Sequence, residues 1–187
     1  MGRKMKKLTR NILISVGILA GLIAILILIL MINFKYQTGK MKPVETSQIL
    51  EDVFVVQDDF VNVYFIKGIE GYIATDAGND PAVVTKELKK LEIDPGHVTA
   101  VLLTHSDYDH VNAVDIYKNA TVYMSSAEEQ LINGSTGRII GMSNTLECQY
   151  TLLEDNQEIE LCGLSVKCLL TPGHTPGSMC YLINGKY

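Results

Sequence analysis

The sequence predicts one α+β domain that follows a single N-terminal transmembrane helix, and three observations support this fold class. Residues 11–32 carry no charge, and 18 of these 22 residues are Ala, Val, Ile, Leu or Met. Short apolar runs typical of strands then alternate with helical patterns from residue 53 to residue 183. The charge is also divided, because residues 1–44 hold 8 of the 16 basic residues and none of the 21 acidic ones.

The apolar run at residues 11–32 is long enough to cross a membrane. As a helix it would measure roughly 33 Å, against about 30 Å for a hydrocarbon core. Five basic residues precede it and three follow it, so the positive-inside rule predicts a cytoplasmic N-terminus and an extracytoplasmic domain. A cleaved signal peptide is the alternative, but the run is longer than a usual signal core and no small-x-small site follows it. We therefore expect a single-pass protein of the cell membrane.

These features predict four segments. They are a basic cytoplasmic N-terminus (1–10), a transmembrane helix (11–32), a juxtamembrane linker (33–47) and a folded domain (48–187). Residues 45–187 carry 8 basic and 21 acidic residues, a formal charge of −13. Because binding to phosphates requires clustered Lys and Arg, we expect no nucleic acid as a partner.

The first half of the domain reads as a strand meander followed by a helix. Strands are expected at 53–56, 61–66 and 71–75, separated by short turns. Asp80 is typical of an N-cap and Pro81 of a first helical position, and apolar residues then follow one helical face to Leu91. A buried strand is expected at 100–103.

The second half continues the alternation. A helix is expected from about Asp109 to Tyr117, a strand at 122–124, and a helix capped by Ser125 or Ser126 that runs to Leu131. Residues 133–150 fit no single pattern. Strands at 164–170 and 178–183 flank a Pro- and Gly-rich loop at 171–177.

Potential metal ligands are concentrated directly after the buried strand. Four of the six consecutive residues 105–110 are candidates, namely His105, Asp107, Asp109 and His110, and His174 lies in the loop at 171–177. Imidazole and carboxylate are the ligands that suit zinc, iron or manganese. Two Pro-Gly pairs flank His174 and limit the entropy that its loop loses on binding. This grouping of three of the chain's four His residues in two strand-end segments predicts a metal site.

In order and spacing, these segments resemble the metallo-β-lactamase fold of metal-dependent hydrolases. The sequence Thr75-Asp76-Ala77-Gly78 resembles that family's Asp-Thr-Gly turn, and His105 to His110 resembles its His-x-His-x-Asp-His motif. The sequence Thr171 to Ser178 resembles the later His loop, closely so in the glyoxalase II and lactamase branches. The resemblance runs from about Val53 to the end of the chain and implies an αββα sandwich.

The resemblance implies a role for each candidate ligand. His105, Asp107 and His174 would form a first metal site, and Asp109 and His110 would begin a second. Asp109 would also be the catalytic residue, orienting or deprotonating the attacking water. One or two divalent ions are implied, with zinc preferred. Manganese and iron are alternatives, because Asp107 stands where the family usually has His and adds a negative charge.

Four further residues are implied to hold the ligand loops in place. Asp76 would tie down the loop that follows the buried strand through hydrogen bonds. The hydroxyl groups of Thr104, Thr175 and Ser178 would act similarly, although turns and caps use such hydroxyls equally well without a metal.

The sequence departs from the family pattern at two further points, the first of which affects the packing of the following helix and the second the completeness of the domain. Asn112-Ala113 stands where the family commonly has Gly-Gly, and the family's bridging Asp and last His would fall after Tyr187. In addition, Asn184-Gly185 is a strong hairpin signal with only two residues behind it. We therefore expect the sandwich to be incomplete at its C-terminus.

The four cysteines all lie in the last 40 residues and lack the C-x-x-C spacing of a structural zinc site; they are Cys148, Cys162, Cys168 and Cys180. Disulfides in any of three pairings and buried free thiols both remain possible, and the apolar setting of Cys168 and Cys180 favours thiols.

Three functional hypotheses follow. The first is a membrane-anchored hydrolase in which a metal-activated water attacks a small ester, thioester or lactone-like substrate outside the cytoplasm. The second is a truncated, inactive protein of the same fold that binds at most one metal ion. The third is a membrane-tethered interaction module in which residues 105–110 form only a polar loop.

Overall fold

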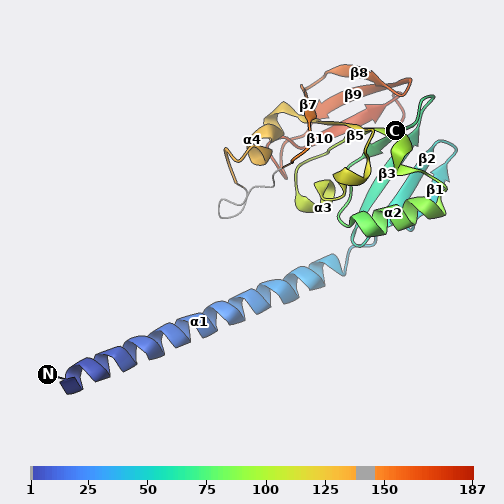
Figure 1. Ribbon diagram of the computed structural model, residues 1–187. Coiled ribbons are helices and arrows are strands. Elements are labelled where there is room, and N and C mark those ends of the chain that lie inside the picture. Colours follow the sequence, from blue (N-terminus) through green and yellow to red (C-terminus); the bar gives the residue numbers. More distant parts are fainter. Residues whose placement is uncertain (1, 138–145) are drawn as a thin grey trace. The chain divides into compact units, whose positions relative to one another are not determined.

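The computed structural model describes residues 2–137 and 146–187, with side chains from residue 9 onward. The chain divides into two units, residues 1–42 and 43–187. The first unit is helix α1 (Gly2–Thr38), which contains the whole apolar run (Figure 1). Its stretch Thr9–Thr38 is long and apolar enough to cross a membrane, by length and composition.

The second unit is built on a seven-stranded mixed sheet whose strands are ordered as they occur in the chain. They are β1 (Ser47–Leu50), β2 (Val53–Asp58), β3 (Val61–Lys67), β4 (Tyr72–Thr75), β5 (Val98–Leu102), β6 (Thr121–Ser125) and β7 (Tyr150–Leu153). Strands β1 to β4 pair antiparallel, which confirms the predicted meander, and β4 to β7 pair parallel. The carboxyl ends of β4, β5, β6 and β7 therefore share one edge of the sheet.

Helix α2 (Pro81–Lys90) covers one face of this sheet (Figure 1). The Asp80 side chain caps it as predicted, accepting hydrogen bonds from the backbone N–H groups of Ala82 and Val83 at 2.8 and 3.3 Å. Val84 and Leu88 are fully buried on the helix face that meets the sheet, in one cluster with Phe65. Each such side chain contributes about 1.5–3 kcal/mol when it leaves water.

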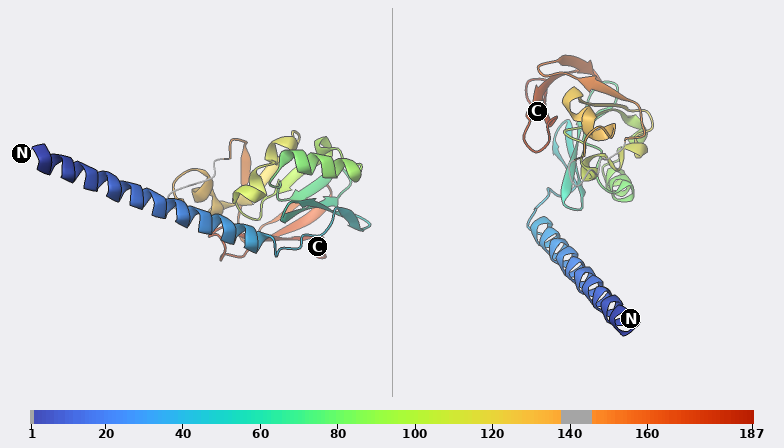
Figure 2. Two further views of the ribbon diagram at one scale, coloured as in Figure 1. Left: turned by 90° about the horizontal axis from the view of Figure 1, so that it is seen from below. Right: turned by 90° about the vertical axis from the view of Figure 1, so that its left-hand side faces the viewer.

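A second, three-stranded antiparallel sheet packs on the other face. It contains β8 (Glu158–Leu161), β9 (Leu164–Leu170) and β10 (Met179–Ile183), in the order β10-β9-β8. Ile73 and Leu102 of the first sheet share a core cluster with Val166 and Ile183 of the second. Within the second unit, α2 and the two sheets therefore form three layers, helix, sheet and sheet (Figure 2).

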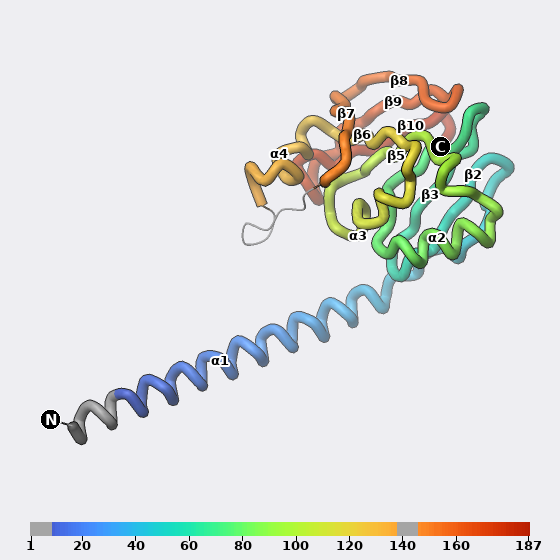
Figure 3. The backbone as a smooth tube through the Cα atoms, viewed as in Figure 1, coloured from blue at the N-terminus to red at the C-terminus, as the bar shows by residue number. Residues whose placement is uncertain are grey.

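The predicted helix from Asp109 to Tyr117 is wrong. The chain instead forms one short α-helix, α3 (Tyr108–Val111), and a separate 3₁₀ turn, η2 (Val114–Ile116) (Figure 3). A continuing helix would direct the Ala113 N–H to the carbonyl of residue 109, but it donates to Gly78 O at 3.0 Å. Asn112 Nδ2 donates to Asn79 O at 2.6 Å. These two bonds to the turn after β4 end the helix.

The segment after β6 begins as predicted, because Ser125 Oγ accepts a hydrogen bond from Ala127 N at 3.1 Å. Its first turn is 3₁₀, η3 (Ser126–Glu128), and a short helix follows, α4 (Glu129–Ile132). A further 3₁₀ turn, η1 (Pro95–His97), precedes β5. Part of the ambiguous region 133–150, residues 138–145, lies outside the described residues.

The four cysteines are all free thiols. Cys162 and Cys168 are buried, Cys148 is half-buried and Cys180 is exposed, so burial was predicted correctly for Cys168 and wrongly for Cys180. Cys180, the second residue of β10, faces away from the core because side chains alternate along a strand.

The predicted turn at Asn184-Gly185 is present. Both residues have positive φ, 51° and 63°, as a two-residue hairpin turn requires. Lys186 N donates to Ile183 O at 3.0 Å, which closes the turn. The expected continuation after Tyr187 stays a prediction.

Candidate metal centre

Parallel pairing brings three loops to the same edge of the large sheet. They follow β4 at Asp76, β5 at Leu103 and β6 at Ser126. A fourth loop, between β9 and β10, carries His174 to this edge, where Met179 N donates to Thr104 O at 2.9 Å. Tyr181 Oη donates to Leu103 O at 2.7 Å and adds a second tie between the two sheets. Loops at the carboxyl ends of parallel strands are the usual location of ligand sites.

The side chains of His105, Asp107 and His174 converge at this edge, with one potential ligand atom from each lying within 4.8 Å of the others. Asp107 Oδ2 lies 3.0 Å from His174 Nε2 and 3.5 Å from His105 Nε2. Two ligand atoms bound to tetrahedral zinc lie about 3.3 Å apart, given zinc–ligand distances of about 2.0–2.1 Å. The donor types and their spacing therefore fit a divalent cation.

Asp76 holds the loop that carries His105 and His110. Its own backbone lies in the left-handed region, with φ 62°, a conformation that Asp tolerates better than most residues. Its carboxylate accepts hydrogen bonds from Thr104 N at 2.7 Å, from Thr104 Oγ1 at 2.9 Å and from His110 Nδ1 at 2.8 Å. One buried carboxylate thus fixes the start and the end of this loop.

These contacts also set which ring nitrogens can bind a cation. The Thr104 hydroxyl donates its one proton to Asp76, so it accepts from His105 Nδ1, which lies 3.0 Å away. The Nε2 atom of His105 then carries a lone pair that faces Asp107. His110 likewise uses Nδ1 for Asp76. In both rings Nε2 is the nitrogen available as a ligand.

The electrostatics of the two rings differ. Burial lowers the pKa of His105, and the nearby His110 ring lowers it further, which favours the neutral imidazole that metals bind. Burial also pulls down the pKa of His110, but the hydrogen bond and charge of Asp76 and the charges of Asp109 and Asp107 outweigh it, so this pKa is raised. The two ring centroids lie 4.0 Å apart.

Asp109 and His110 lie beside this cluster. Asp109 Oδ2 is 3.6 Å from His110 Nε2. Within residues 2–137 and 146–187, the only group of three or more convergent ligand atoms is that of His105, Asp107 and His174. The proposed second site is therefore represented by two donors in the described chain.

Thr175 and Ser178 act within their own loop. Their hydroxyl oxygens lie 2.8 Å apart, and Ser178 Oγ accepts a hydrogen bond from Thr175 N at 3.0 Å. Thr175 is buried. These bonds brace the turn that presents His174, rather than touching the ligand rings.

One residue at the site was not predicted. Glu128, only 1% exposed, accepts hydrogen bonds from Ser106 N at 2.8 Å, from Ser106 Oγ at 2.6 Å and from Gly177 N at 3.0 Å. Its local sequence, Ser125-x-x-Glu128, matches a capping box, in which the Glu would bond back to its own helix. The partners lie 22 and 49 residues away, so no local signal could have identified them.

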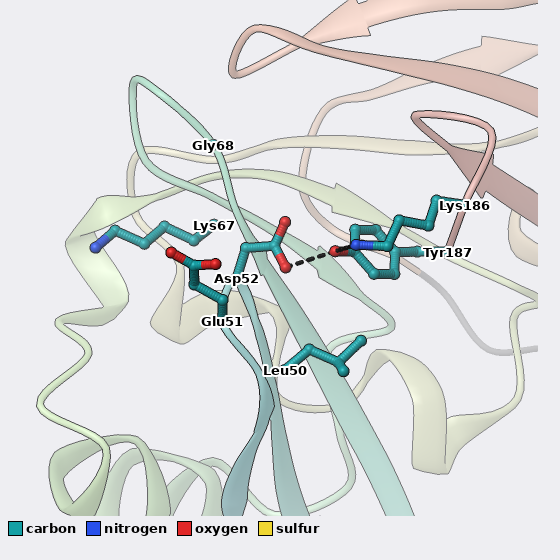
Figure 4. Close-up of a pocket in the computed structure, with 7 residues that line it drawn as sticks. All are labelled: Leu50, Glu51, Asp52, Lys67, Gly68, Lys186 and Tyr187. Carbon is teal, nitrogen blue, oxygen red and sulfur yellow. Dashed lines mark hydrogen bonds between the residues drawn. The ribbon is translucent and has the colours of Figure 1, made fainter.

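A separate cavity of about 560 Å³ lies away from this edge (Figure 4). Lys67, in its wall, pairs with Tyr72 at the start of β4, whereas the candidate ligands follow the end of the parallel strands. Tyr187 Oη donates to Asp52 Oδ1 across it at 2.6 Å. The lining residues are Leu50, Glu51, Asp52, Lys67, Gly68, Lys186 and Tyr187. None of them is a candidate metal ligand.

Solved structures share this architecture. BJP-1, a subclass B3 metallo-beta-lactamase of Bradyrhizobium japonicum, is 20% identical with a TM-score of 0.66, over 76% of this chain and 58% of that one. A metallo-beta-lactamase from Cronobacter sakazakii is 21% identical with a TM-score of 0.67, over 80% and 58%. The fold is thus that of the metallo-beta-lactamases. Residues 56–186 match the model of the metallo-beta-lactamase superfamily, and the chain belongs to that superfamily.

Curated relatives carry hydrolase names. The chain is 37% identical over 116 residues to a probable polyketide biosynthesis zinc-dependent hydrolase, BaeB, of Bacillus velezensis, covering 60% of this chain and 45% of the relative. It is 22% identical over 150 residues to a hydroxyacylglutathione hydrolase of Prochlorococcus marinus, covering 78% and 51%. The chain spans about half the length of these relatives.

Proposed function

We propose that this protein is a metal-dependent hydrolase, anchored in the cell membrane by α1, that acts on a small ester, thioester or lactone-like substrate outside the cytoplasm. The observation that carries this proposal is the convergence of His105, Asp107 and His174 within 4.8 Å at the carboxyl edge of the parallel strands. The names of relatives, a zinc-dependent hydrolase and a hydroxyacylglutathione hydrolase, support a metal-dependent reaction on an acyl substrate.

His105, Asp107 and His174 would hold the first cation, and Asp109 and His110 would begin a second site. Zinc is the preferred ion, with manganese or iron as alternatives because Asp107 is an oxygen ligand. A divalent cation bound there supplies Lewis acidity and lowers the pKa of a water ligand.

The chain's own residues supply orientation and proton transfer. His110 is hydrogen-bonded to Asp76, whereas the Asp109 side chain is 29% exposed beside the cluster. We assign it the role of accepting a proton from the attacking water. Asp76 keeps His110 and Thr104 in place, so the loop does not have to reorganise when substrate binds.

A metal-binding protein without hydrolase activity is the second candidate. The observation that favours it is the unequal donor count, since three donors converge on one point and Asp109 and His110 form only a pair in the described chain.

The full chain, purified in detergent and loaded with zinc or manganese, is tested against nitrophenyl esters, acyl thioesters and lactones. We expect turnover that Asp109→Asn lowers by about 100-fold or more, while the cation held by His105, Asp107 and His174 is retained. Asp115→Asn, the same change at an exposed Asp, is the matched control and should have no effect. A metal-loaded chain that hydrolyses none of the panel would favour the second candidate.

A further inference from the structure

Glu128 links the two loops that carry the candidate metal ligands. Its Oε1 accepts from Ser106, which lies between His105 and Asp107, and its Oε2 accepts from Gly177, three residues after His174. Glu128 itself follows β6, and its two partner residues lie in the loops that follow β5 and β9. We propose that Glu128 is a positioning residue that sets the spacing between the His105 loop and the His174 loop, and thereby the affinity and geometry of the metal site. This inference rests on the proposed function.

The chemistry of the contact requires two acceptors. The backbone N–H groups of Ser106 and Gly177 can only donate, and each meets a different oxygen of Glu128. A glutamine would present one oxygen and one NH₂ group. One of the two buried N–H groups would then face another donor, and the corresponding loop would lose its attachment.

Steric contact reinforces this link on the His174 side. A Cβ atom at Gly177 would lie 2.3 Å from the backbone nitrogen of Glu128 and 2.6 Å from its Cα. Because these are backbone atoms, they cannot move aside as a flexible side chain could. At Gly173, on the other side of His174, a Cβ would meet nothing within 4 Å. The loop is therefore held against Glu128 at Gly177 and is open at Gly173.

A purely structural role for Glu128 would change stability and leave the bound metal unaltered. The position of Ser106 between two candidate ligands predicts more than that. Loss of either attachment should move His174 relative to His105 and Asp107. At present Asp107 Oδ2 lies 3.0 Å from His174 Nε2 and 3.5 Å from His105 Nε2. The coordination geometry of a bound ion reports such a change directly.

The test uses cobalt(II) as the probe, bound to the full chain in detergent, with affinity measured by competition and coordination by the absorption bands at saturation. Glu128→Gln should lower cobalt and zinc affinity by about 10- to 100-fold and shift the bands. Glu129→Gln is the matched control, because the neighbouring Glu129 contacts Tyr150 instead, and it should alter neither quantity.

A second pair of variants gives the answer even where Glu128→Gln fails to fold. Gly177→Ala should lower affinity and shift the bands, and Gly173→Ala should not. If Glu128→Gln folds and its metal affinity and absorption bands are unchanged, the inference is overturned but the proposed function is not. If Glu128→Gln does not fold, the same result for Gly177→Ala overturns the inference. An unmodified chain that binds no cobalt or zinc would overturn the inference together with the proposed function.

Discussion

Asp107 is the residue that distinguishes this candidate metal centre from one built of three imidazoles. Its carboxylate lies between the Nε2 atoms of His105 and His174, at 3.5 and 3.0 Å. A carboxylate adds negative charge and a hard oxygen donor, and both favour manganese or iron relative to zinc. The choice of metal should therefore depend on this one side chain.

Asp107→His should raise the preference for zinc over manganese by about tenfold or more, since imidazole suits zinc better than a carboxylate does. Competition titrations of the two ions measure this preference, with Asp115→His as a control at an exposed position. Unchanged selectivity would remove Asp107 from the coordination sphere.

Asp58 gives a pH prediction away from the ligands. It is fully buried, and its Oδ2 accepts from Asn79 N and Asp80 N, while Oδ1 has no hydrogen-bond partner. Burial raises its pKa above the ordinary 3.8 despite these two bonds. The folded state therefore retains the proton to a higher pH than the unfolded state, so stability is lost as pH rises from 3.8 through the raised pKa.

Asp58→Asn cannot ionise and keeps an acceptor oxygen, so its free energy of unfolding should fall less than that of the original chain as pH rises through this window. Chemical unfolding at several pH values above 4 measures the two slopes. The control is Asp59→Asn, at the exposed neighbouring position. Parallel slopes for Asp58→Asn and the original chain would contradict this explanation.

The candidate ligands could be found in the sequence because four of them lie within six consecutive positions, where local spacing alone indicates chemistry. Glu128 could not be found in this way. Its partners come from other loops, and its own neighbourhood matches a helix cap. Residues whose role depends on distant backbone groups need the fold before they can be recognised.

At the scale of elements, the cap of α2 carries a measurable share of stability. The Asp80 side chain satisfies two N–H groups that the helix itself leaves unpaired. Asp80→Ala should lower the free energy of unfolding by about 1 kcal/mol. Lys86→Ala, an exposed change in the middle of the same helix, should stay within about 0.5 kcal/mol of the original. Equal effects of the two changes would exclude a capping role.

Most elements with strong local signals were predicted correctly, whereas the end of α3, which tertiary contacts decide, was not. The meander and α2 depend on alternation and on Asp80-Pro81, which act within a few residues. The break after α3 depends on the bond from Ala113 to Gly78, 35 residues earlier in the chain. β1 was missed because most of its side chains are exposed, and a short edge strand needs no apolar alternation. β8 was missed although Glu158 to Leu161 alternates with period two.

At the scale of the whole molecule, the charge division gives a prediction about topology. The basic residues that precede the apolar run outnumber those that follow it, so the N-terminus should be cytoplasmic and the acidic unit external. A protease added to intact cells should then remove residues 43–187 and leave a short membrane-bound fragment. Complete protection of this unit in intact cells, with digestion after lysis, would reverse the orientation.

The fold could be predicted at this scale because the order of four motifs, rather than any one of them, limits the arrangement. The four motifs come together only if β4 and β5 are parallel neighbours. They are the turn at Asp76, the helix at Asp80, the segment 105–110 and the loop at His174. The candidate metal ligands lie where these motifs converge, so the metal site is the central claim about function.

The most direct measurement is the metal content of the full purified chain by elemental analysis, compared with the double variant His105→Ala, His174→Ala. We predict about one or two equivalents of a divalent metal per chain, lost in the variant. No bound metal, or the same content in both proteins, would contradict the site.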